Sequence, residues 1–76
     1  MTLSFLDLLQ QENRAVKDVD ATKKIIGIYL EEQSTADAKA ASTIQEILVD
    51  EYEVLTERKE RLSECRKAIR KYLAEL

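Results

Sequence analysis

The sequence predicts an all-α fold in which a long C-terminal helix packs against one or two shorter helices. The 76 residues include no proline, one glycine and 36% charged side chains, a composition typical of long helices. Apolar residues also recur every seven positions in the second half, and only an α-helix turns that spacing into a continuous stripe. The repeat consists of Leu48, Leu55, Leu62, Ile69 and Leu76. Both observations predict a single helical domain over residues 1–76.

The first helix is predicted over about residues 5–32. Ser4 and Asp7 have the spacing of a capping box at its start. Apolar residues then follow a four-three rhythm, and we expect them to face the core: Phe5, Leu9, Val16, Val19, Ile26 and Leu30. Apolar density falls between Lys17 and Lys24, which leaves two alternatives, one continuous helix or two helices broken near residues 18–20. The second alternative would make a three-helix unit.

The chain is predicted to turn at about residues 33–36. Ser34, with Asp37 three residues later, is expected to cap the helix that follows. A short connection usually joins antiparallel neighbours, so the simplest architecture is an antiparallel helical hairpin. The second helix is expected over about residues 36–75, because no helix breaker interrupts it. Its repeat and the small size of the chain predict a dimeric helical bundle of two copies.

The apolar side of the second helix is the predicted interface. It is broad between residues 44 and 55, as in a bundle core, and narrower beyond residue 61, as in a two-helix coiled coil. The predicted interface residues are Ile44, Leu48, Tyr52, Leu55, Leu62, Cys65, Ile69, Tyr72 and Leu76. Glu51 and Arg58 fall on the same side and leave two alternatives. Either they pair with each other between two antiparallel copies, or both reach water.

Charged side chains form two further candidate surfaces for a partner. An acidic stripe that includes Glu53, Glu57 and Glu60 is expected to be a solvated face or to meet a basic protein partner. The same helix carries a basic flank of Lys59, Arg66 and Arg70, which is expected to pair with acidic residues of the same chain or of a second copy.

An uneven charge distribution supports that pairing. Residues 1–53 contain 11 acidic and five basic side chains, whereas residues 54–76 contain four acidic and seven basic ones. The two parts should therefore attract each other, although exposed ion pairs contribute only about 0–1 kcal/mol each. The basic flank could instead follow the phosphates of a nucleic acid. The net charge of −3 and the interleaved glutamates disfavour RNA and DNA as partners.

Catalytic chemistry has no basis in this composition. The chain has no histidine and one cysteine, and it shows no triad, no metal-ligand spacing and no phosphate-binding glycine loop. We therefore predict no enzyme activity, no cofactor and no metal. Cys65 lies on the apolar stripe and is expected to be structural.

The expected function is that of a small α-helical protein-protein interaction module. It would self-associate as a homodimer and bind a protein partner. A lone cysteine and the lack of a long apolar run predict a cytoplasmic protein with no membrane association. Two alternatives remain. One is a phage- or mobile-element-type regulator or inhibitor of a larger enzyme, and the other is an RNA- or DNA-associated adaptor that uses the basic flank.

Overall fold

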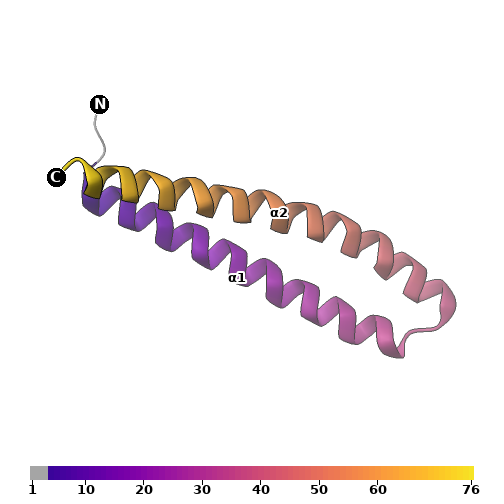
Figure 1. The fold of residues 1–76 in the computed structure, drawn as a ribbon. Helices are drawn as coiled ribbons and strands as arrows, with labels where there is room; N and C mark the ends of the chain where they lie inside the picture. The colour runs from indigo at the N-terminus through magenta and orange to yellow at the C-terminus, as the bar shows by residue number, and fades with distance from the viewer. Residues whose placement is uncertain (1–3) are drawn as a thin grey trace.

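The computed structural model describes residues 4–76. They contain two antiparallel α-helices joined by a short turn (Figure 1). Helix α1 spans Phe5–Thr35 and helix α2 spans Ala38–Ala74. The hairpin is 57 Å long and only 19 by 14 Å across, and the start of α1 lies at the same end as the end of α2. The all-α prediction is confirmed, and the arrangement fits the predicted hairpin. Helix α1 continues without a break through residues 18–20.

Helix α1 begins with the capping box that the sequence predicts. The backbone N–H of Asp7 donates to Ser4 Oγ at 3.1 Å, and the backbone N–H of Ser4 donates to the Asp7 carboxylate at 3.3 Å. Two N–H groups of the first turn, which have no partner within the helix, are satisfied in this way. The local sequence therefore fixes where α1 starts.

The turn between the helices lies later than predicted. Asp37, not Ser34, caps α2, and its carboxylate accepts a hydrogen bond from the backbone N–H of Ala40 at 2.8 Å. The prediction for Ser34 is wrong, because Ser34 remains within α1 and its hydroxyl donates to the Glu31 carbonyl at 2.6 Å. A carboxylate accepts more strongly than a hydroxyl near the positive end of a helix. The turn is consequently reduced to residues 36 and 37.

The core is one stripe of side chains between the two helices. The buried residues of α1 recur in steps of three and four, apart from one step of seven: Leu8, Ala15, Val19, Thr22 and Ile26. Helix α2 contributes Leu48 and Leu55, with Ile44 and Leu62 packed against the same cluster. These steps keep the side chains on one face of each helix. The two faces meet along the hairpin and form a mostly apolar seam that includes the polar side chain of Thr22.

The side of α1 that faces α2 differs in part from the predicted one. Val19 and Ile26 are buried as predicted, but Leu9 and Leu30 are 40% and 45% exposed. The expectation that these two leucines face the core is wrong. Helix α1 is rotated so that the seam includes two smaller side chains, those of Ala15 and Thr22. The predicted rotation would instead have turned Lys23 toward the core.

Contacts between the helices close both ends of the hairpin. The rings of Phe5 and Tyr72 stack near the termini, with centroids 5.2 Å apart and planes inclined by 16°. Near the turn, Gln33 Nε2 donates to Gln45 Oε1 at 2.9 Å and to the Ala41 carbonyl at 3.3 Å.

Within residues 4–76, neither helix is long and apolar enough to cross a membrane.

Candidate interaction surfaces

Most of the predicted interface residues of α2 contact α1 of the same chain. Leu48 is 1% exposed and Leu55 is also buried. Five others are half-buried on this side of α2: Ile44, Leu62, Cys65, Ile69 and Tyr72. Tyr52 and Leu76 are exposed. The seam is thus largely covered within one chain, so a second copy would need another surface.

Arg58 makes a polar contact inside this seam. Its Nη1 donates to Thr22 Oγ1 at 2.5 Å and to the Asp18 carbonyl at 3.2 Å. The Thr22 side chain is fully buried, and its hydroxyl donates to the same carbonyl at 2.9 Å. A pair with Glu51 is not needed to satisfy Arg58. Glu51 is half-buried and makes no ion pair with the part of the chain that the structure describes.

Thr22 was not among the residues predicted from the sequence. Its position in the sequence could have indicated that it is buried, since it lies three residues after Val19 and four before Ile26, which are both buried. That spacing places it on the face that packs against the partner helix. A threonine at such a position either donates its hydroxyl to the backbone or meets a polar group of the partner. Thr22 does both.

A groove with four cationic side chains lies between the helices. Its volume is about 350 Å³, and it is lined by Val19, Lys23, Lys59, Leu62, Ser63, Arg66 and Arg70. Among residues 4–76, Arg66 and Glu12 make the one ion pair between the helices, at 3.5 Å. No described carboxylate lies within ion-pair distance of Lys23, Lys59 or Arg70. We call this site the basic groove.

Exposed apolar side chains border the basic groove at both of its ends. Two sets of residues are each spaced by seven positions. The set on α1 consists of Leu9, Val16, Lys23 and Leu30, and the set on α2 consists of Tyr52, Lys59, Arg66 and Leu73. Steps of seven keep each set in one line. Since Lys23, Lys59 and Arg66 share the groove, the two lines border the same side of the hairpin.

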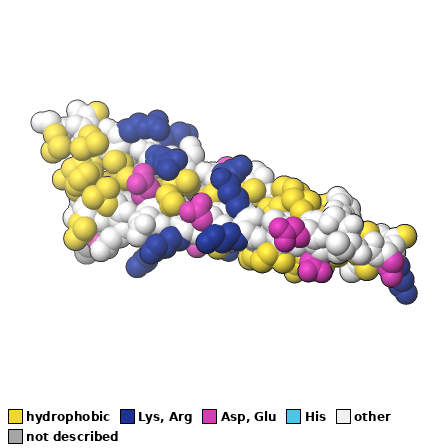
Figure 2. Space-filling view, turned by 90° about the horizontal axis from the view of Figure 1, so that it is seen from below, with side chains coloured by type: hydrophobic (Ala, Val, Ile, Leu, Met, Phe, Trp, Pro, Cys, Tyr) yellow, Lys and Arg dark blue, Asp and Glu magenta, His cyan; other side chains and the backbone are white. Residues whose placement is uncertain are grey.

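This side of the hairpin, which we call the basic-centred face, has an apolar–basic–apolar order. Leu30 and Tyr52 lie toward the turn, whereas Leu9 and Leu73 lie toward the termini, and all four are at least 40% exposed. In the view of Figure 2, most Lys and Arg side chains lie between the terminal end and the middle of the molecule, with Asp and Glu side chains among them. Hydrophobic side chains crowd the end that carries the termini.

A second apolar surface lies across the seam from the basic groove. Ile25 and Ile28 are exposed on α1, and Ile47 and Val54 are half-buried on α2. Ile25, Ile47 and Val54 each directly precede a buried seam residue, and in an antiparallel pair such positions border one side of the seam. We call this surface the isoleucine face.

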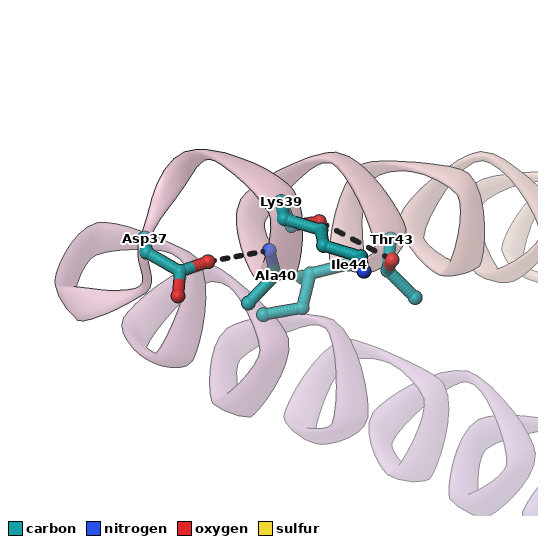
Figure 3. Close-up of a pocket in the computed structure, with 5 residues that line it drawn as sticks. All are labelled: Asp37, Lys39, Ala40, Thr43 and Ile44. Atoms are coloured by element: carbon teal, nitrogen blue, oxygen red, sulfur yellow. Dashed lines mark hydrogen bonds between the residues drawn. The ribbon is translucent and has the colours of Figure 1, made fainter.

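A hollow of about 420 Å³ lies beside the first turns of α2 (Figure 3). Two of its polar side chains already have partners in α2, since Asp37 accepts from the Ala40 N–H and the Thr43 hydroxyl donates to the Lys39 carbonyl at 3.3 Å. Ala40 and Ile44 complete the lining. The surface of the hollow is mainly apolar.

The acidic stripe lies on the outside of α2. Glu53, Glu57 and Glu60 are all exposed. The neighbouring Glu64 forms an ion pair with Lys67, with a nitrogen–oxygen distance of 3.3 Å. In the described part of the chain, no group of three or more histidine, cysteine or carboxylate side chains is arranged to hold a metal ion. The stripe therefore offers negative charge to a partner, and its described carboxylates do not form a cluster that could hold a metal ion.

Comparisons with known proteins do not assign the chain. It matches no family model, no curated protein and no solved structure. Its surfaces are therefore the basis for a functional proposal.

Proposed function

We propose that the chain is a non-enzymatic protein-protein interaction module that self-associates as a dimeric helical bundle. The observation that carries this proposal is the large surface that a two-helix hairpin leaves uncovered. Its accessible surface is 5942 Å², whereas a compact chain of 8.7 kDa exposes roughly 4,700 Å². The excess exceeds the about 800 Å² that each partner buries in a standard interface.

The isoleucine face is the surface that we assign to a second copy. Its branched side chains extend the seam sideways, which gives each helix the wide apolar stripe of a bundle with more than two helices. Two hairpins packed through it would form a four-helix bundle, with Ile25 and Ile28 of one copy close to Ile47 and Val54 of the other. The basic-centred face suits a second copy less well, because it would place like charges against each other.

A charge scan of the two apolar surfaces tests this assignment. We expect the parent chain to show twice its monomer mass in sedimentation velocity at micromolar concentration. Ile25→Lys with Ile28→Lys should reduce that mass to the monomer, because lysine ammonium groups would be buried in the bundle. The matched control, Val49→Lys with Leu73→Lys, adds the same charge at exposed apolar positions outside the isoleucine face and should keep the dimer.

Two results would contradict the proposal. One is a parent chain that remains monomeric up to millimolar concentration. The other is a control variant that dissociates while the isoleucine variant does not. Helicity measured by circular dichroism at each concentration separates dissociation from unfolding, since a bundle that is needed for folding loses both together.

A further inference from the structure

We infer that the basic-centred face binds an acidic, amphipathic helix of a partner protein. This deepens the proposed function and rests on it, because it gives the chemistry of the partner that an interaction module would take. It uses a different surface from the one assigned to self-association. A failure of one proposal can therefore be distinguished from a failure of the other.

The middle of the face supplies charge that the chain itself does not neutralise. Lys23 from α1 and Lys59, Arg66 and Arg70 from α2 line one groove. One carboxylate of the described residues, that of Glu12, forms an ion pair with this set, through Arg66. Four cations brought together by two separate helices favour an anionic occupant, and repel a second copy of the same face.

The ends of the face restrict the occupant further. Leu30 and Tyr52 at one end, and Leu9 and Leu73 at the other, are exposed apolar side chains that gain free energy when a partner covers them. An occupant must then be apolar at both ends and acidic between them. Leu9 and Leu30 are 21 helical steps apart, about 32 Å at 1.5 Å per residue. A helix of about three heptads matches that length and lies between α1 and α2 as a third helix.

Two other occupants fit less well. A nucleic acid carries charge along its whole length, so its phosphates would lie against the leucines at both ends. The acidic stripe of a second copy supplies Glu53, Glu57 and Glu60, but Lys39 and Lys67 lie beyond its two ends. It therefore lacks the apolar ends that the face requires.

Binding of a designed peptide tests the inference. The probe is a fluorescein-labelled helical peptide of three heptads, with leucines on one face of the first and last heptads and glutamates on that face of the middle heptad. The matched control peptide has the same composition, with the same leucines and glutamates distributed evenly over that face of all three heptads. We expect fluorescence anisotropy to give at least about tenfold tighter binding of the probe to the full chain.

Charge reversal in the chain gives the second arm. Lys23→Glu with Lys59→Glu should weaken binding of the probe at least about tenfold. Lys17→Glu with Lys24→Glu changes the charge equally on an exposed line of α1 outside the groove and should leave binding within about twofold. Lys23→Gln with Lys59→Gln should give an intermediate loss, and it keeps the test valid if the reversed variant loses helicity.

Four outcomes would overturn the inference. The first is equal binding of the two peptides, and the second is an equal loss in the groove variant and its control. The third is tighter binding of a single-stranded RNA of the same charge than of the probe, if that RNA binding is lost in the variant Lys23→Gln with Lys59→Gln. The mass of the groove variant should equal that of the parent chain. The fourth outcome is a changed mass, which would assign the groove to self-association instead.

Discussion

Arg58 of α2 donates a hydrogen bond to the hydroxyl of Thr22, whose side chain is fully buried in α1. The two residues are 36 positions apart, so this contact joins the helices at one relative position. A shift of α2 by one heptad would place Arg58 beside Ala15, which has no side-chain acceptor, or beside Tyr29, whose hydroxyl lies at the far end of a ring. A polar seam residue fixes the register of coiled coils in the same way.

The Thr22–Arg58 contact should appear as a coupling free energy. We expect Thr22→Val alone to lower the free energy of unfolding by about 1 kcal/mol, because Arg58 loses a buried acceptor. Thr22→Val with Arg58→Leu should be less destabilised than the sum of the single variants, since an apolar pair leaves no unsatisfied group. Urea unfolding followed by circular dichroism measures all four corners of the cycle. Values that add within about 0.5 kcal/mol would show no coupling.

Leu48 should be essential for the fold. It is 1% exposed and belongs to the central cluster, so Leu48→Ala should remove about 2–5 kcal/mol of stability. A two-helix hairpin has little stability to lose, and we expect loss of helicity at 25 °C. Val49→Ala is the matched control, because Val49 is half exposed and should change stability by less than about 0.5 kcal/mol. Equal effects in thermal melts would contradict the position of the seam.

Gly27→Ala should stabilise the chain. Gly27 lies within α1, has no positive φ, and a methyl group added there would meet nothing within 4 Å. Alanine is favoured over glycine by about 1 kcal/mol in a helix interior, which raises Tm by roughly 4–8 °C in a domain of this size. A lower Tm, measured well above the dimer dissociation constant, would mean that a second copy occupies this space.

The start of α2 gives a test that separates the observed cap from the predicted one. Asp37→Ala should lower the free energy of unfolding by about 1 kcal/mol, because the backbone N–H of Ala40 loses its acceptor. Ser34→Ala should change it by less than about 0.5 kcal/mol, since the Ser34 hydroxyl is exposed and bonds only within α1. Denaturant unfolding of both variants gives the comparison. A larger effect at Ser34 would restore the predicted boundary.

Local sequence signals predicted the two helices well and the rotation of α1 poorly. The box of Ser4 and Asp7 involves residues three apart, so it can be recognised without tertiary structure. The rotation cannot, because α1 has apolar neighbours at Leu8 and Leu9, and either could face inward. Packing against α2 decides between them.

The basic groove shows the same limit. Lys59, Arg66 and Arg70 could be grouped from the sequence, because they share one side of one helix. Lys23 could not be added to them, since only the antiparallel packing of the hairpin brings it to the same groove. A site built by two elements needs their relative register, which one helical pattern does not contain.

The contacts that close the hairpin also set an order in which it can form. Gln33 and Gln45 are 12 residues apart, Thr22 and Arg58 are 36 apart, and Phe5 and Tyr72 are separated by nearly the whole chain. Closing a short loop loses less chain entropy than closing a long one. Folding should thus begin beside the turn and proceed like a zipper toward the termini. Heat should open the aromatic stack of Phe5 and Tyr72 first, and the leucines at that end would then be the first apolar groups to reach water.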